Sequence, residues 1–473
     1  MTGAAEATVG KSPGAAAVAD SDPHAQLILT GHPWRVMWAM SWPAVAVMML
    51  FGLNAVMDAV FIGQLLGEQA LAGTVLAYPI TQLTLGLGSL AGIGGGVALS
   101  IAIGRGERGL MRCLPGTCVA IAAGLSLAYA VLGAGLAETL VQGMGADGEL
   151  VPIAASYLRA SALGGFGAIA GMTLNMLLRG EGKMKLAAAY MGIGLLVNII
   201  LTPIMIGVLE FGVAGAAWAT NIGGLIGGLL VWRRFLYGRA SYPVNPRYIG
   251  LNRILVRRIV RLGTPAAIMS SMGLVQAIVV FNMLSRVGNE ADVAFFGAAW
   301  RVLIFLLTPL FGLMRAFQPV AGINHGAGQW DRVRTSYWTF VIAGVLMVLP
   351  IWLLITAFPE QTLILMLPET DFTSADLHHF RVLMLVLPVL PIVFTALALL
   401  PAIEQPGKAT LVSVSRQLLL YVPVMLLLPP LIGIQGIYYG ATAIDFLCTL
   451  WLLLIVLHAF QSSDGAAIRR GIA

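Results

Sequence analysis

The sequence predicts an all-α polytopic membrane protein, with twelve transmembrane helices in two six-helix lobes related by a pseudo-two-fold axis along the membrane normal. Three observations predict this fold: the apolar composition, a repeat of the first half of the chain in the second, and the alternation of charge between successive loops. The chain has 473 residues, of which 59% are hydrophobic and only 10% are charged. Its mean hydropathy is +0.89. Soluble globular chains are about one quarter charged, so this composition indicates a membrane protein.

Apolar runs recur along the whole chain. A helix needs about 20 apolar residues to cross the hydrocarbon core of a bilayer. We expect spans at 35–63, 70–104, 114–142, 151–178, 186–208, 211–236, 257–286, 292–318, 335–358, 380–402, 409–430 and 435–459. Glycine and proline inside several of these runs indicate close helix packing or locally broken helices.

The second half of the chain repeats the pattern of the first. Pro43 is matched by Pro265, 222 positions later, and at the same shift the stretch 70–112 lies over 292–334. Each half then holds six of the expected spans. Because six is an even number, both halves enter the membrane from the same side, and parallel repeats of this kind are expected to enclose a cavity between them.

One residue breaks the repeat. Gly104 and Gly326 match at this shift, but Asp58, inside the first apolar span, is matched by Val280. A charged side chain at the bilayer centre costs about 2.5–3.5 kcal/mol on insertion scales, and such residues commonly mark ion paths. We therefore expect ion coupling in the N-terminal half. The plainer interpretation is a structural Asp that hydrogen-bonds to neighbouring helices.

Loop charges predict the orientation. Lys and Arg gather in the loops that follow the even-numbered spans, whereas the opposite loops carry Asp and Glu. Because positive residues mark cytoplasmic loops, we expect the inner (plasma) membrane with both termini cytoplasmic. The net charge of +6 then reflects topology, and no nucleic-acid partner is expected. The expected organisation is a disordered cytoplasmic tail at 1–32, an N-lobe at 33–236, a cytoplasmic linker at 237–256, a C-lobe at 257–460 and a cytoplasmic tail at 461–473.

Other polar residues of the first half are candidates to join Asp58. Asn198 and Thr202 are four residues apart and share one helix face. Asn175 lies in the fourth span and Thr220 in the sixth. Their oxygens suit cation binding or a proton relay. Asn and Thr in membrane helices also serve as plain helix–helix contacts.

Further residues inside spans have structural interpretations. Pro43 removes a backbone hydrogen bond from the first span, which makes it a candidate hinge or an ordinary kink. Arg301 and Asp445 in the second half fit structural ion pairs. The chain carries no HExxH, Walker A or nucleophile-elbow motif. We therefore expect no enzymatic activity and no cofactor, and a transport process driven by an ion gradient.

Four motifs follow one another in order: NAVMDAVFIG in span one, NMLLRGEGK after span four, LLVNIILTPI followed by GVAGAAWAT, and QPVAGINHGAG after span eight. From about residue 33 to 460 the chain resembles the multidrug and toxic compound extrusion (MATE) family. The resemblance implies twelve helices in two lobes, alternating access, and export of small organic compounds, cationic ones included, against inflow of H⁺ or Na⁺. We expect a monomer in the lipid bilayer.

Within this family the chain resembles the branch whose cation site lies in the N-lobe. The resemblance implies a bending proline at Pro43 and a cation-coupling motif at Asp58, Tyr157, Asn175, Asn198 and Thr220. Members of the branch often carry a second Asp where this chain has Thr202. One carboxylate alone favours H⁺, while neutral oxygens leave open a Na⁺ site at Asp58, Asn198, Thr202 and Thr220.

Other functions remain as alternatives. A flippase for a lipid-linked saccharide precursor belongs to the same wider superfamily. Such proteins tend to have a strongly cationic central cavity, whereas most Lys and Arg here lie in loops. A membrane-embedded enzyme would need convergent catalytic groups, and a receptor would not need two matched halves.

Overall fold

The computed structural model describes residues 22–144, 146–237, 249–364 and 372–471. Within these ranges the chain is helical and contains no strand. Ten helices of the described residues are long and apolar enough to cross a membrane, and an eleventh span is the pair Leu150–Leu163 and Gly165–Gly180, bent by 49°. The remaining expected span is divided between Ser374–Met384 and the shorter apolar helix Leu390–Ala402. The predicted fold class is confirmed.

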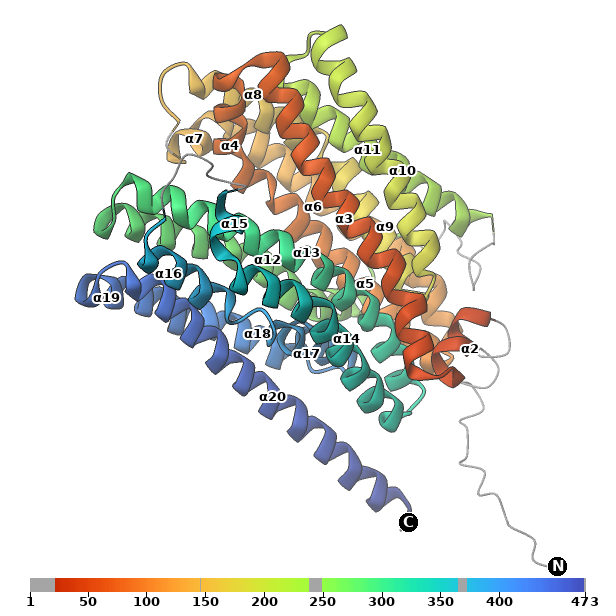
Figure 1. The fold of residues 1–473 in the computed structure, drawn as a ribbon. Helices are drawn as coiled ribbons and strands as arrows, with labels where there is room; N and C mark the ends of the chain where they lie inside the picture. The colour runs from red at the N-terminus through yellow and green to blue at the C-terminus, as the bar shows by residue number, and fades with distance from the viewer. Residues whose placement is uncertain (1–21, 145, 238–248, 365–371, 472–473) are drawn as a thin grey trace, which may run out of the picture.

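The helices of the first half pack together as the N-lobe, beside those of the second half, the C-lobe (Figure 1). The N-lobe comprises α3 (Pro33–Leu66), α4 (Glu68–Thr81), α5 (Leu83–Arg105), α6 (Arg108–Gly135), α7 (Ala137–Gly143), α8 (Leu150–Leu163), α9 (Gly165–Gly180), α10 (Met184–Pro203), the π-helix η1 (Ile204–Val208) and α11 (Gly212–Leu236). The C-lobe comprises α12 (Arg253–Val287), α13 (Glu290–Gly326), α14 (Trp330–Ala357), α15 (Pro359–Ile364), α16 (Ser374–Met384), α17 (Leu390–Ala402), α18 (Pro406–Val414), the π-helix η3 (Ser415–Tyr421), α19 (Val422–Ile432) and α20 (Gln435–Gly471).

Residues with strong backbone preferences set the helix ends. Pro33 begins α3, where the missing N–H would have had no partner within the helix. Asn289 and Asp292 form a capping box at the start of α13. Gly106 ends α5 with a φ of 72°, a left-handed conformation that glycine adopts without steric strain.

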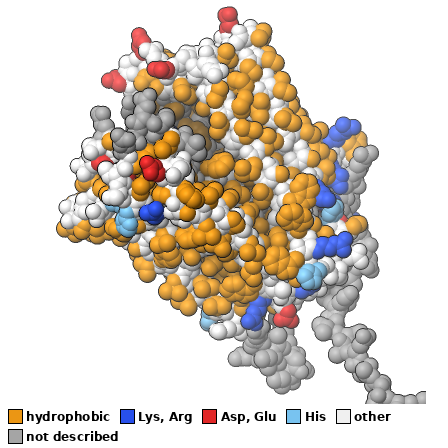
Figure 2. All heavy atoms as spheres, in the orientation of Figure 1, with side chains coloured by type: hydrophobic (Ala, Val, Ile, Leu, Met, Phe, Trp, Pro, Cys, Tyr) orange, Lys and Arg blue, Asp and Glu red, His pale blue; other side chains and the backbone are white. Residues whose placement is uncertain are grey.

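Charged side chains separate toward the two ends of the bundle. We call the end where α3 begins and α20 ends the terminal end, and the opposite one the distal end (Figure 1). On the face shown in Figure 2, Lys and Arg gather toward the terminal end, most Asp and Glu lie toward the distal end, and hydrophobic side chains cover the middle. This distribution agrees with the loop charges of the sequence, while the side of the membrane that each end faces remains a prediction.

The expected disordered tail at 1–32 is wrong in its last part. Residues Pro23–Thr30 form α2, whose first turn is capped by Asp22: its carboxylate accepts the backbone N–H of His24 at 3.0 Å. A helix of 8 residues is too short to give the sequence a recognisable apolar run. Residues 1–21 lie outside the described residues.

Helix α2 contacts both lobes at the terminal end. Arg332, in α14 of the C-lobe, donates to the carbonyls of Ile28 at 2.9 Å and Gly31 at 2.6 Å. Lys183, which follows α9 of the N-lobe, lies 3.5 Å from the carboxylate of Asp22. The buried side chains of α2 pack into the same hydrophobic cluster as both lobes, so this segment is part of the folded domain.

Two other segment boundaries differ from those expected. Helix α12 begins at Arg253, inside the expected linker 237–256, and α20 continues to Gly471, beyond the expected lobe limit of 460. Apolar runs predict only the part of a helix inside the membrane, and charged residues extend a helix into water. Within the linker and the C-terminal tail, residues 238–248 and 472–473 lie outside the described residues.

Glycines bring the two lobes into backbone contact at the terminal end. A Cβ atom on Gly104 of α5 would lie 2.1 Å from the carbonyl oxygen of Ile323 and 2.9 Å from the Cα of Gly326, both in α13. A Cβ atom on Gly94 would lie 2.1 Å from the carbonyl oxygen of Ile259 in α12. Because Gly104 and Gly326 are repeat partners, their mutual contact places them beside the pseudo-two-fold axis. The lobes are closed against each other at this end.

An ionic network covers this contact. Arg105 pairs with Glu404, in the loop between α17 and α18, and Arg258 of α12 lies 3.2 Å from the same carboxylate. Burial raises the pKa of Glu404, but the hydrogen bond and charge of Arg105, aided by Arg258, outweigh burial and hold its pKa below the ordinary value.

We expect acid to loosen the terminal-end contact. Since the pKa of Glu404 is lowered in the closed state, its contribution is complete above the ordinary value of about 4.3 and is lost as the pH falls through the lowered value. The carboxylate is more than one third exposed, so the closed population should fall only a few-fold. Spin-label distances between α5 and α13 measure this population. Glu404→Gln should make it independent of acid, whereas Glu360→Gln, at an exposed residue of α15, should leave the wild-type response; an acid-insensitive wild type would contradict the prediction.

Candidate functional site

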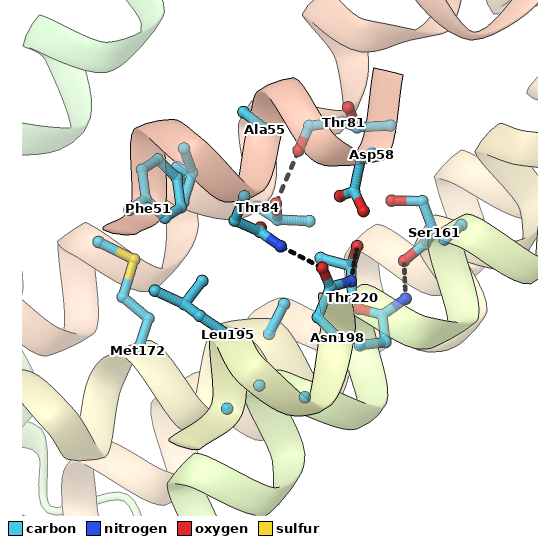
Figure 3. Close-up of a pocket in the computed structure, with 18 of the residues that line it drawn as sticks. Phe51, Ala55, Asp58, Thr81, Thr84, Ser161, Met172, Leu195, Asn198 and Thr220 are labelled. Carbon is cyan, nitrogen blue, oxygen red and sulfur yellow. Dashed lines mark hydrogen bonds between the residues drawn. The ribbon is translucent and has the colours of Figure 1, made fainter. Parts of the chain in front are cut away.

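A large cavity lies inside the N-lobe. Its volume is about 540 Å³, within the range of roughly 300–1,000 Å³ found for small-molecule sites. Helices α3, α4, α5 and α8 to α11 form its walls, and Arg315 of α13 reaches it from the C-lobe. Apolar side chains such as Phe51, Met172 and Leu195 line one side (Figure 3).

Asp58 points from α3 into this cavity (Figure 3). Thr202, near the end of α10, donates its hydroxyl to Oδ1 of Asp58 at 3.2 Å and is itself fully buried. In the described part of the chain, no Lys, Arg or His nitrogen lies within 4.0 Å of the carboxylate. The carboxylate therefore has a hydroxyl partner and no counter-charge.

Three more polar residues form a chain of hydrogen bonds beside Asp58. Asn54 of α3 donates to the amide oxygen of Asn198 in α10. Asn198 donates in turn to the hydroxyl of Thr220 in α11 at 3.0 Å. Thr220 donates to the carbonyl of Ala216 at 3.1 Å. Asn198 and Thr220 border the space into which Asp58 points (Figure 3).

Two of the expected site residues lie apart from this chain. Tyr157 of α8 lines the same cavity. Asn175 also lines it, but its amide donates to the carbonyl of Ala187 at 2.7 Å and its oxygen accepts from Nε of Arg179 at 2.9 Å. Asn175 lies toward the terminal end of α9, whereas Asn198 lies toward the distal end of α10. The structure thus gathers Asp58, Thr202, Asn198 and Thr220 but gives Asn175 other partners.

Sequence reasoning missed Asn54. It lies four residues before Asp58, so both occupy one face of α3. That spacing was the available signal.

Replacing Asn54 with alanine should destabilise the N-lobe by about 1–3 kcal/mol, because the buried amide oxygen of Asn198 loses its donor. Thermal unfolding of the purified protein measures this loss. Thr84→Ala is the matched control, since Thr84 lines the same cavity but its hydroxyl donates to a backbone carbonyl only three residues earlier, that of Thr81, at 2.6 Å. Equal melting temperatures for the two variants would exclude the proposed role of Asn54.

A local change of helix type follows Thr202. Pro203 has no backbone N–H, and directly after it α10 becomes the π-helix η1. In the C-lobe, α18 likewise passes into the π-helix η3, which contains Arg416. Such segments are frequent at functional sites. In each lobe the widened turn adjoins a polar residue inside the membrane.

The corresponding part of the C-lobe is closed. Val280, the repeat partner of Asp58, is only 2% exposed and packs in an apolar cluster with Phe296. Asp445 forms the expected structural ion pair, with Arg416 at 2.6 Å, while Arg301 is exposed. In the C-lobe, Arg416 neutralises the carboxylate of Asp445, whereas in the described part of the N-lobe no cation neutralises the carboxylate of Asp58.

Pro43 is buried inside α3, which continues as one helix through it (Figure 1). Gly312 of α13 packs closely beside it: a Cβ atom there would lie 2.8 Å from the Cα of Val45. The hinge role of Pro43 stays a prediction.

A two-lobed bundle of membrane-spanning helices, with an unpaired carboxylate in a cavity of small-molecule size, defines a multi-pass membrane transporter. The family model described as MatE matches residues 43–204 and again residues 265–427. The chain therefore belongs to the MatE family. The second match begins at Pro265 and the first at Pro43, the same shift of 222 residues that the sequence repeat shows.

Relatives and solved structures cover nearly the whole chain. Multidrug export protein MepA of Staphylococcus aureus is 24% identical over 425 residues, which are 89% of this chain and 93% of MepA. MepA of Staphylococcus haemolyticus shows the same values. A crystal structure of MATE in the bent conformation has a TM-score of 0.88 at 22% identity, covering 94% of this chain and 99% of the other. An outward-facing multidrug resistance MATE family transporter has a TM-score of 0.85 at 22% identity, with the same coverage. At this identity the structures establish the fold alone.

Proposed function

We propose that this protein exports small drug-like organic compounds by alternating access, driven by inflow of a cation through the N-lobe. The observation that carries the proposal is Asp58, a carboxylate without a counter-charge in a cavity of about 540 Å³. The relatives named for multidrug export support this substrate class over a lipid-linked saccharide.

H⁺ is the proposed coupling ion. A charged Asp58 opposes closure of the cavity, because closure removes water from an ion that has no counter-charge. A proton arriving from the distal side neutralises the carboxylate and lifts this penalty, so the cavity can close and expel its substrate. Proton and substrate then bias one equilibrium in opposite directions, which is the reciprocity that exchange requires.

Na⁺ fits the same residues less well. Of its four proposed ligands, only Asp58 is charged. The amide oxygen of Asn198 is engaged by Asn54, and the hydroxyl of Thr220 is bonded to Ala216. Each of these two oxygens already accepts one hydrogen bond, so each has one lone pair left for a Na⁺ ion, and only one negative charge would hold that ion.

The setting of the protein is also part of the proposal. We propose a monomer in the plasma membrane with both termini, and hence the terminal end, in the cytoplasm. The positive residues at the terminal end support the orientation. No bound cofactor is required beyond the coupling ion.

Transport in liposomes under separately imposed gradients tests the proposal. Ethidium efflux should follow an imposed H⁺ gradient and should not respond to a Na⁺ gradient at fixed pH. Efflux that needs Na⁺ at fixed pH would reassign the ion, and the absence of efflux under either gradient would reject the exporter.

A further inference from the structure

Two arginines without acidic partners lie at the terminal end of the N-lobe cavity. Arg179, in the last turn of α9, is only 2% exposed. Arg315 of α13 lines the cavity and also lines, together with Arg179 and Gln318, an adjoining pocket of about 10 Å³. Among the described residues, no carboxylate oxygen lies within 4.0 Å of either guanidinium.

Their hydrogen bonding is incomplete as well. Arg179 donates from Nε to Asn175 at 2.9 Å and from Nη2 to the sulfur of Met191 at 3.3 Å, but its buried Nη1 has no partner within the described residues. The buried Nε of Arg315 also has none there. Buried polar groups are normally bonded, and charges inside a membrane are normally paired. Arg179 and Arg315 are adjacent cations that lack both an acidic partner and full hydrogen bonding within the described residues, so an anionic ligand would complete the site.

Helix ends do not explain the arrangement. The carbonyl end of α9 offsets part of the charge of Arg179, because this effect acts within the last turn. Arg315 receives no such compensation, since α13 continues well beyond it to Gly326.

We propose that Arg315 and Arg179 bind the oxyanion, a carboxylate or a phosphate, of an amphipathic organic substrate. The inference rests on the proposed export function and narrows its substrate class to include organic acids and zwitterions. Guanidinium groups match oxyanions in geometry and charge. The narrow pocket between the two arginines has room for about one water-sized group, which is one oxygen atom of the oxyanion. The rest of the molecule lies in the cavity, where the apolar wall with Phe51 and Met172 receives its body. Asp58 lines the same cavity, where it can face the cationic part of a zwitterion.

Binding of a matched dye pair tests the proposal. Rhodamine B and its ethyl ester differ only in the carboxylate. Fluorescence anisotropy with the purified full-length protein should show tighter binding of the acid than of the ester. Arg315→Gln should weaken binding of the acid by roughly ten- to a hundredfold, the expected effect of losing a charge-assisted hydrogen bond, and should change binding of the ester less than about twofold.

The chain offers a matched control on the same helix. Arg301 is exposed and does not line the cavity, so Arg301→Gln should change neither affinity. Arg315→Lys keeps the charge and should restore part of the preference for the acid. Because Arg315 makes no hydrogen bond to another described residue, its replacement should not impair folding. An Arg315→Gln protein that keeps the full preference for the acid overturns the proposal.

Competition with short-chain lipids distinguishes a lipid headgroup from a small organic acid as the source of the oxyanion. Displacement of the acid by dihexanoylphosphatidylglycerol, but not by dihexanoylglycerol, which lacks the phosphate, supports the oxyanion site and assigns it to a headgroup; displacement by neither supports a small organic acid. Equal binding of acid and ester to the wild type, with no effect of either lipid, overturns the site. H⁺-driven efflux of the ester tests the export function separately: if it persists while the preference for the acid is absent, only the inference fails.

Discussion

Replacing Asp58 with asparagine should abolish H⁺-driven efflux, with a loss of at least about a hundredfold in the initial rate. Asparagine keeps the size of the side chain and a polar contact for Thr202 but holds no exchangeable charge. If one proton titration links the gradient to cavity closure, the variant retains its cavity and loses its driving force. Dye efflux from liposomes under an imposed H⁺ gradient gives the rate, and dye binding to the same protein shows that the cavity persists.

Glu149→Gln is the matched control for this variant, because it removes a carboxylate from an exposed distal loop. It should leave the efflux rate unchanged. Undiminished H⁺-driven efflux by the Asp58→Asn protein would show that another group couples transport, and a loss of dye binding would show that the change acts on the cavity itself.

Replacing Gly104 with alanine should also disable transport, through the contact between the lobes. The added Cβ would lie 2.1 Å from the carbonyl oxygen of Ile323, a backbone atom that cannot swing aside. Overpacking of this kind costs about 1–3 kcal/mol, and here it falls on the state that is closed at the terminal end. The population of that state should drop by about one to two powers of ten, since each 1.4 kcal/mol is a factor of ten.

Cysteine cross-linking across the terminal ends of α5 and α13 measures this population, together with the efflux rate. Gly124→Ala in α6 is the matched control, since no atom lies within 4 Å of a Cβ built there. Cross-linking of the Gly104→Ala protein at the wild-type level would mean that the added methyl group does not lower the population of the closed state, and would contradict the prediction.

The membrane-spanning helices could be predicted because each one is marked by its own run of apolar residues. Apolar length alone located the spans, and the 222-residue shift between similar sequence stretches paired the two lobes. Composition could not reveal α2, because its 8 residues are held by Arg332 and Lys183, which are distant in sequence. Asp22 followed by Pro23 is a local signal for a helix start, but the segment lacks the long apolar run that located the other helices.

The sequence likewise predicted individual residues of the candidate site but not their grouping in space. Asp58 stood out because a carboxylate in an apolar span is rare, and the i, i+4 spacing of Asn198 and Thr202 indicated one face. Their grouping with Thr220 and Asn54 depends on how α3, α10 and α11 pack, which no single span encodes. Asn175 shows the limit: its spacing allowed a place beside Asp58, but a neighbouring arginine and a backbone carbonyl take its hydrogen bonds.

The contact between Gly104 and Gly326 bears on how the two halves diverged after duplication. A residue beside the symmetry axis meets its own copy, so a larger side chain in either copy collides with the other, and both copies stay small. Asp58 and Val280 lie away from the axis in unlike surroundings, one in an open cavity and one in an apolar cluster. At these positions the two copies differ: one carries a charge and the other is part of the apolar core. The two halves can therefore differ in function while the contact between α5 and α13 that joins them stays the same.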